Sequence, residues 1–154
     1  MTKLALLTTA LLSAGATACT IEASSGDEIV DSNLSGYVAG QSWNFVAGHT
    51  DSFLSEGEDD FFAVLFPTSF TPCGFSEPSG PHIIVSIPKT TGDFEMDFGR
   101  NMTFVDGSDN KVAFDGRIRV DSVSATSVTG GLVASYDSDN EINGTFTVTV
   151  CPED

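Results

Sequence analysis

Apolar and polar residues follow one another in short runs along the chain from residue 36 onward. Residues 93–98 (Asp-Phe-Glu-Met-Asp-Phe) alternate strictly, so their apolar side chains, including Phe98, are expected on one buried face of a strand. Residues 61–66 are apolar at every position, which predicts a central strand covered on both faces, and residues 83–87 predict the next strand. The dominant period of this part of the chain is therefore that of β-structure.

About nine or ten such runs can be counted in this part of the chain, with turn-forming Gly, Pro, Asn and Asp residues between them. No stretch of about ten residues here has helical spacing. Short connections between consecutive strands predict antiparallel pairing. We therefore expect residues 36–154 to form one all-β domain, an antiparallel β-sandwich, with a closed β-barrel as the alternative.

Residues 1–18 have a different pattern. A single basic residue, Lys3, precedes an apolar run that is too short to cross a bilayer as a helix. Small residues follow and end in Ala-Thr-Ala at positions 16–18. A basic start, a short apolar centre and an A-x-A site are typical of a secretory signal peptide, which we expect to be cleaved after Ala18.

Cleavage after Ala18 would leave Cys19 as the first residue. Residues 16–19 (Ala-Thr-Ala-Cys) resemble the lipobox of bacterial lipoprotein precursors, with Ala16 where leucine is commonest in that family. The resemblance implies that Cys19 carries a diacylglycerol. It also implies sorting to the outer membrane, because Thr20 stands where an Asp would favour the inner membrane. A soluble secreted protein, cleaved at the same bond, is the alternative.

Residues 19–35 are polar and have no sustained period, so we expect a lipidated N-terminus and a flexible tether there. Three segments of the predicted domain are similar to small Gram-negative lipoproteins of unknown function. They are residues 36–43 (Gly-x-Val-x-Gly-x-x-Trp), 116–120 (Gly-Arg-Ile-Arg-Val) and 143–146 (Asn-Gly-Thr-Phe). That second resemblance implies no activity.

The chain has three cysteines. If Cys19 is acylated, Cys73 and Cys151 remain, and an exported chain usually pairs its thiols. We therefore expect a disulfide between them. Closing a loop of roughly 80 residues would stabilise the fold by about 4.5 kcal/mol on the chain-entropy model.

The chain is strongly acidic, with 6 Lys and Arg against 22 Asp and Glu and a formal net charge of −16. Such a surface repels phosphates, so we expect no nucleic-acid partner and no electrostatic attraction to an anionic membrane. Membrane attachment would depend on the lipid. No phosphate-binding or dinucleotide-binding glycine pattern is present in the sequence, and no cofactor is expected.

Acidic residues near the C-terminus form a weak candidate calcium site. Asp137, Asp139 and Glu141 offer oxygen ligands, but the next glycine, Gly144, comes too late for an EF-hand loop. Turn formation by Asp and Asn explains the segment without an ion, so no metal is assigned.

A second acidic row is expected on the surface of the sheet. Asp93, Glu95 and Asp97 share one face of their predicted strand, at a spacing too wide for all three to bind one ion. We expect them to face Arg117 and Arg119 on a neighbouring strand.

Catalytic motifs are missing from the sequence. His49 and His82 are its two histidines, and a zinc site would need further ligands from cysteine or carboxylate. The G-x-S-x-G and S-x-x-K patterns do not occur. No catalytic residue is therefore assigned.

These features predict a lipid-anchored cell-envelope module that binds a partner or has a structural role, without catalysis. The partner would be a protein, a glycan or an apolar ligand. A carrier of an apolar small molecule in a barrel-like domain is the alternative, and an exported hydrolase is the third reading. An apolar cavity would favour the carrier, and titratable groups converging in a cleft would favour the enzyme.

Overall fold

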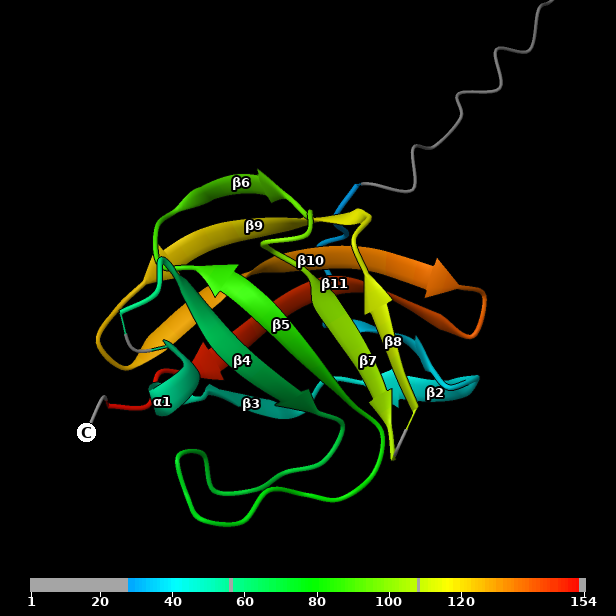
Figure 1. The fold of residues 1–154 in the computed structure, drawn as a ribbon, viewed down its shortest axis with the longest axis horizontal. Coiled ribbons are helices and arrows are strands. Elements are labelled where there is room, and N and C mark those ends of the chain that lie inside the picture. Colours follow the sequence, from blue (N-terminus) through cyan, green and yellow to red (C-terminus); the bar gives the residue numbers. More distant parts are fainter. Residues whose placement is uncertain (1–27, 56, 108, 153–154) are drawn as a thin grey trace, which may run out of the picture.

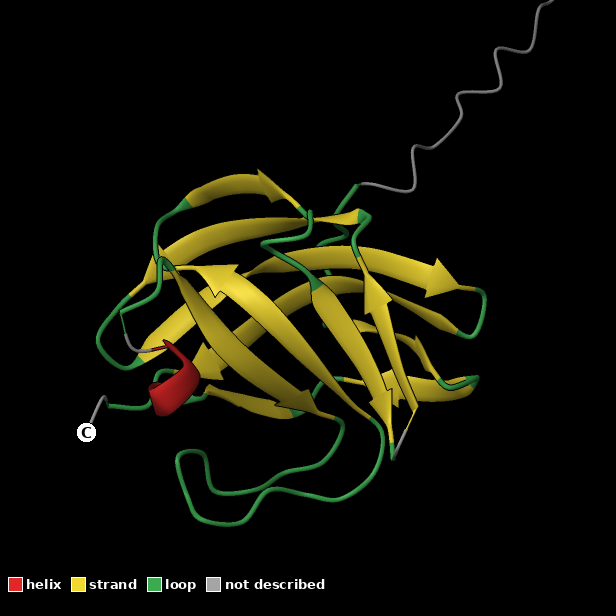
Figure 2. Cartoon of the chain, in the orientation of Figure 1, coloured by secondary structure: helices red, strands yellow, loops and turns green. Residues whose placement is uncertain are grey.

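The computed structural model describes residues 28–152 except residues 56 and 108. This part of the chain is all-β, with one short helix, α1 (Figure 2). It contains eleven strands, slightly more than the nine or ten that the sequence predicts. In chain order the elements are β1 (Ser35–Val38), β2 (Gln41–Asn44), β3 (Ala47–Thr50), α1 (Ser52–Ser55), β4 (Asp60–Phe66), β5 (His82–Pro88), β6 (Gly92–Glu95), β7 (Met102–Asp106), β8 (Asp109–Ala113), β9 (Gly116–Val123), β10 (Ser127–Asp137) and β11 (Asn140–Thr149).

The strands form one curled sheet in the order β6-β9-β10-β11-β3-β4-β5-β7-β8 (Figure 1). β1 adds to the side of β11 and carries β2. The named strands pair antiparallel except β11 and β3, which run parallel and share one register pair, Thr149 and His49. The expectation of purely antiparallel pairing is therefore wrong at this junction, where the chain reaches β11 from β3 through the whole domain rather than through a hairpin.

The inner face of the curled sheet encloses the hydrophobic core. The curl brings β7 near β1, β8 near β10 and β5 near β9, so side chains from opposite halves of the sheet meet. Successive side chains of a strand point to opposite faces, so every second residue of β4 points inward. These residues, Phe61, Ala63 and Leu65, are almost completely buried. Trp43 of β2 and Phe45, which alternate with a polar residue in sequence, are also buried.

The outer face of β4 is covered as well, by the long connection between β4 and β5. Val64 and Phe66 point away from the core cluster, yet they are 6% and 1% exposed. Residues 67–81 pass over this face without forming a helix or strand. The prediction of a strand apolar on both faces is thus confirmed, and a loop supplies the second cover.

Residues 28–35 lie against the sheet, which differs from the predicted tether. Leu34 is completely buried, and its N–H donates to the carbonyl oxygen of Thr145 at 2.9 Å. Asp31 lies 3.5 Å from the guanidinium of Arg119. The folded part therefore begins before Gly36, because Leu34 fills a place in the core. The predicted signal peptide and Cys19 lie outside the described residues.

A tight turn changes the predicted course of the chain after β6. The carboxylate of Asp97 accepts hydrogen bonds from the N–H groups of Gly99 and Arg100, at 2.7 and 2.8 Å. This turn ends the alternation, and Phe98 is 87% exposed, with its ring 4.7 Å from that of Phe114. The inward position expected for Phe98 is wrong.

Candidate functional site

A cleft that brings a histidine and two carboxylates beside the disulfide lies where β3, the β4–β5 loop and the C-terminal segment meet. It has a volume of about 360 Å³, and we call it the disulfide cleft. Its walls come from three separate parts of the chain. They are His49, Thr50, Asp51 and Ser52 at the end of β3 and the start of α1, Cys73, Gly74, Phe75 and Glu77 on the loop, and Cys151 and Pro152 after β11.

The floor of the disulfide cleft is a cross-link. Cys73 and Cys151, the two cysteines expected to pair, form a disulfide with Cα atoms 5.4 Å apart. Cys151 is buried, and its N–H donates to the hydroxyl of Thr50 at 2.9 Å. Cys73 is exposed and has a φ of +59°, a left-handed conformation that costs energy for a residue other than glycine. The bond therefore ties the loop to a rigid strand end.

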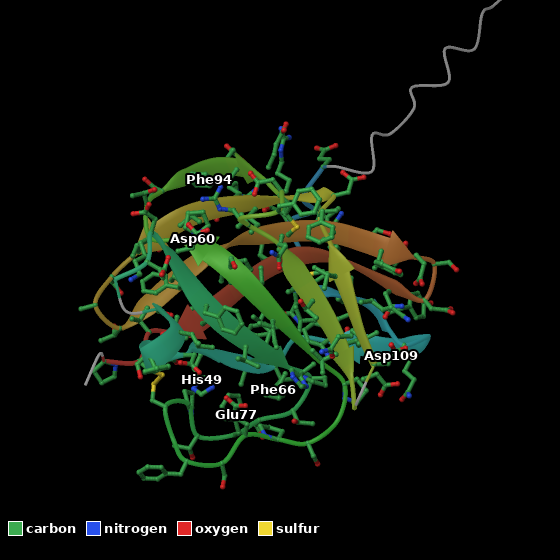
Figure 3. The ribbon with its side chains drawn as sticks, viewed as in Figure 1. His49, Asp60, Phe66, Glu77, Phe94 and Asp109 are labelled. Atoms are coloured by element: carbon green, nitrogen blue, oxygen red, sulfur yellow. A yellow bond between two sulfur atoms is a disulfide. The ribbon has the colours of Figure 1, made fainter. Side chains whose placement is uncertain are left out.

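His49 links the loop to β3 through both of its ring nitrogens. Nδ1 accepts a hydrogen bond of 2.9 Å from the N–H of Cys73, so the ring proton is on Nε2. Nε2 therefore donates to the Oε1 carboxylate oxygen of Glu77 at 2.8 Å, and the two labelled side chains lie next to each other in Figure 3. The His49 side chain is only 8% exposed, whereas that of Glu77 is 47% exposed. The pair joins residues 28 positions apart in sequence.

Aromatic rings continue this contact across the outer face of β4. Phe66 packs against His82 with ring centroids 5.1 Å apart, and against Phe70 at 5.0 Å. Phe70 in turn meets the His49 ring edge to face at 5.2 Å. Both histidines of the chain thus belong to one row of four rings beneath the loop. Each pair adds an attraction of about 1 kcal/mol beyond its buried area.

The hydrogen bonds of His49 limit what it can do in this oxidised state. The lone pair of Nδ1 accepts the hydrogen bond from the Cys73 N–H. Nε2 keeps its proton and donates it in the hydrogen bond to Glu77. A general base needs a free lone pair within reach of the proton that it removes. In this geometry both ring nitrogens of His49 hold the loop against β3.

A second cleft, of about 450 Å³, lies at the other side of α1 and contains an arginine. Arg100 donates from Nε and from an Nη atom to the two carboxylate oxygens of Asp60, at 2.9 and 3.0 Å. Its guanidinium carbon lies 5.0 Å from the centre of the Phe94 ring. Hydrogen bonds from the N–H groups of Arg100 and Gly99 lower the pKa of the Asp97 carboxyl at the rim. The charge of Arg100 is therefore balanced by Asp60, and its guanidinium stacks on Phe94. Both contacts hold the walls of this cleft in place.

The candidate calcium ligands form a turn. Asp137 accepts hydrogen bonds from the N–H of Asp139 at 3.0 Å and from the side-chain amide of Asn140 at 2.8 Å. This contact closes the connection between β10 and β11. Among the described residues, the group of His, Cys, Asp or Glu side chains close enough to share an ion is instead His49, Cys73 and Cys151.

Two members of the second acidic row, Asp93 and Glu95, lie opposite the arginines as predicted, whereas Asp97 lies in the turn after β6 and does not. β6 pairs with β9 in a register that sets Asp93 beside Arg119 and Glu95 beside Arg117. Arg119 makes its ion pairs elsewhere, with Asp121 at 2.9 Å on its own strand and with the N-terminal segment. The hydrogen bond to Asp121 raises the pKa of the Arg119 guanidinium.

Sequence reasoning identified the two cysteines of the disulfide cleft but missed its polar partners. The carboxylate nearest to His49 in sequence belongs to Asp51, whereas its partner in space is Glu77. Glu77 lies in a Pro- and Gly-rich loop with no local pattern to mark it. Its proximity to His49 follows from the cross-link at Cys73, four residues earlier, and this was the available signal.

A comparison with known proteins found no family model, no curated protein and no solved structure that matches the chain. Within residues 28–152, with their two gaps, none of the helical structure has the length and apolarity needed to cross a membrane. Functional inference therefore starts from the sites themselves.

Proposed function

We propose that this chain is a lipid-anchored module of the bacterial cell envelope that binds a partner without catalysis. In this proposal Cys19 carries the lipid at the outer membrane, and the β4–β5 loop, residues 67–81, carries the binding surface. The observation that supports the binding role is the position of Phe75. This residue is fully exposed although its loop is fastened to the sheet by a disulfide and by the His49–Glu77 contact.

A fastened loop with an exposed aromatic residue is suited to recognition. Fixing a loop before binding reduces the conformational entropy that binding would otherwise cost. Large aromatic side chains are the usual anchors at the centre of protein interfaces and also stack on sugars and apolar ligands. The partner class is therefore a protein, a glycan or an apolar ligand, and the net charge of −16 disfavours nucleic acid.

The arrangement of the domain suits attachment through its N-terminal side. The first described residues lie against β9, β10 and β11, whereas the β4–β5 loop lies at the opposite end of the domain in Figure 1. An anchor that precedes residue 28 would thus leave the loop pointing away from the membrane. This placement supports the proposal that the loop meets a partner in the space beyond the lipid.

The other two readings have less support. A carrier needs an apolar interior cavity, and the inner face of the curled sheet is filled by buried side chains such as Phe104, Leu132 and Phe146. We infer a sandwich rather than a closed barrel, because β6 and β8 end the strand order without pairing with each other. A hydrolase that used histidine as its base would need a free ring nitrogen, and both nitrogens of His49 are hydrogen-bonded in this state.

The anchor is tested by labelling cells with a radioactive fatty acid. The wild-type chain should take up the label, a Cys19→Ala variant should lose it, and a Cys73→Ala variant, as the matched control, should keep it. Intact mass of the wild-type protein should show cleavage after Ala18 together with the acyl chains. An unlabelled wild-type protein, or a labelled Cys19→Ala variant, would contradict the anchor.

The binding surface is tested by placing a photoreactive phenylalanine analogue at position 75 in living cells. We expect a discrete cross-linked species after illumination. Phe98 is a matched control, because it is also highly exposed but lies on another part of the surface. Equal cross-linking at both positions, or none at position 75, would remove the support for the loop as a binding surface.

A further inference from the structure

Three side-chain donors that bind transition metals meet at the floor of the disulfide cleft. The sulfur atoms of Cys73 and Cys151 and a ring nitrogen of His49 all lie within 4.8 Å of one another. Two sulfurs and one imidazole are a ligand set used by zinc sites that keep a fourth position open for solvent. The donors come from β3, the loop and the C-terminal segment, so the fold itself brings them together.

The spacing of two of these donors already fits a tetrahedral metal. Cys151 Sγ lies 3.6 Å from His49 Nδ1. With Zn–S and Zn–N bonds of about 2.3 and 2.05 Å, a tetrahedral zinc would hold these atoms roughly 3.6 Å apart. The buried residues Cys151 and His49 could therefore bind a zinc ion with little movement. The remaining adjustment falls on Cys73, which lies on the loop.

Cys73 is the member of the set that is able to move. It is exposed, it lies in the middle of a loop without regular structure, and its backbone has the unfavourable φ of +59°. Breaking the sulfur–sulfur bond would allow the backbone to leave this conformation. The same movement would withdraw the Cys73 N–H from His49 Nδ1 and free the lone pair of that nitrogen.

Glu77 prepares the imidazole for this role. A metal-binding histidine usually donates its other ring N–H to a carboxylate, which fixes the tautomer and makes the binding nitrogen more basic. The contact of 2.8 Å between His49 Nε2 and Glu77 Oε1 has this arrangement, with Nδ1 directed at the sulfurs. The carboxylate thus serves as a positioning residue for the third ligand.

We propose that reduction of the Cys73–Cys151 disulfide creates a zinc site formed by both cysteine sulfurs and His49 Nδ1. A dithiol reductant supplies two electrons and two protons; the sulfur–sulfur bond breaks, two thiols form, and the reductant becomes a disulfide. Zn²⁺ then binds the two sulfurs as thiolates, displaces their two protons to solvent and takes the lone pair of Nδ1. Solvent fills the fourth position. The proposed zinc site does not rest on the anchor, but it uses the same loop and cross-link as the proposed binding surface.

The test is a titration of the full chain with Co²⁺, a spectroscopic substitute for zinc, and a competition with Zn²⁺. Every sample carries Cys19→Ser, so that the remaining thiols are those of Cys73 and Cys151. After reduction by a phosphine, we expect one equivalent of Co²⁺ to bind with a thiolate-to-metal absorption band. The oxidised chain, which has the same carboxylates, should lack this band and bind at least about 100-fold more weakly.

Matched variants then separate the ligands from their surroundings. In the reduced chain, His49→Ala should weaken Co²⁺ binding at least about 10-fold, and Glu77→Gln should weaken it about 10-fold through loss of orientation. His82→Ala, which changes the other histidine of the ring row, should leave the affinity unchanged. Binding without a thiolate band, or equal affinities for His49→Ala and His82→Ala, would overturn the proposal.

A measurement on the wild-type ligands keeps the test decisive if His49→Ala does not fold. X-ray absorption of the reduced, zinc-loaded Cys19→Ser chain should give two sulfur neighbours at about 2.3 Å and nitrogen or oxygen neighbours at about 2.0–2.1 Å. A shell of oxygen atoms alone would place the metal on surface carboxylates and refute the site.

Discussion

The two faces of β4 are both packed, but they are packed by different means. On the inner face, Ala63 and Leu65 belong to the core cluster that fills the curl of the sheet. On the outer face, Val64 and Phe66 are covered by one loop that a disulfide and a histidine hold in place. The inner face therefore depends on many strands at once, and the outer face on a few contacts within residues 67–81.

This difference predicts two kinds of failure. A cavity in the inner core weakens every strand that borders it, so the whole domain should lose stability. A break under the loop should free the loop while the sheet stays folded, because local opening takes place where few buried contacts are lost. Equilibrium unfolding and amide hydrogen exchange, used together, separate these outcomes.

The largest effect is expected from Phe104→Ala on the inner face. Phe104 is 1% exposed and belongs to the core cluster, so truncation should cost about 3–5 kcal/mol of unfolding free energy. The measurement is the urea midpoint, and the slope should stay that of a single transition. Phe98→Ala is the matched control: the 87% exposed ring should cost less than about 0.5 kcal/mol. Equal losses for the two variants would disprove the proposed core.

Removal of the cross-link by Cys73→Ala together with Cys151→Ala should have the second largest effect. Its sequence separation of 78 residues makes the constraint on the unfolded chain large, and we expect a loss of about 2–4 kcal/mol. Amides of residues 67–81 should exchange faster by a larger factor than those of β10 and β11. A uniform increase across the sheet would show that the disulfide supports the whole domain rather than the loop.

The inner face was largely predictable from sequence, whereas the outer face was not. The strictly apolar run now seen as β4 indicated cover on both sides. Residues 145–150 alternate in sequence, which sets Phe146 and Val148 on one face, and these two residues are 3% and 1% exposed. Strand pairing amplifies such local signals, because a slip of one residue would expose every apolar side chain. The parallel junction between β11 and β3 has no local signal and follows from the closure of the whole sheet.

The candidate site was only half predictable for the same reason. If one of the three cysteines carries a lipid, the other two, Cys73 and Cys151, are left to pair. This inference needs no knowledge of the fold. The pairing of His49 with Glu77 depends on where the loop crosses β3, and that path is fixed by the cross-link and by the ring row of Phe66 and Phe70. Contacts made by side chains across long separations leave no period in the sequence.

A smaller effect is expected from His49→Ala, which removes a contact beneath the loop without breaking the cross-link. The Cys73 N–H and the Glu77 carboxylate would both lose their partner, so we expect a cost of about 1–3 kcal/mol. Loop amides should exchange faster in this variant. In the control His82→Ala, the lost hydrogen bond to Gly80 lies at an exposed position, and the loss should be smaller. A larger loss for His82→Ala than for His49→Ala would refute this ranking.

The smallest effect is expected at Asp97, which belongs to neither packed face and so supplies a baseline for purely local contacts. Backbone hydrogen bonds lower the pKa of its carboxyl, so its contribution to stability is present above the pKa of the unfolded chain, about 3.9, and is lost as pH falls through the folded pKa. Asp97→Asn should therefore shift the urea midpoint slightly at neutral pH, and this difference from wild type should shrink in strong acid. Asp93→Asn is the matched control on the neighbouring strand β6. A difference between Asp97→Asn and wild type that is the same at neutral and acid pH would mean that the carboxylate charge contributes nothing to this turn.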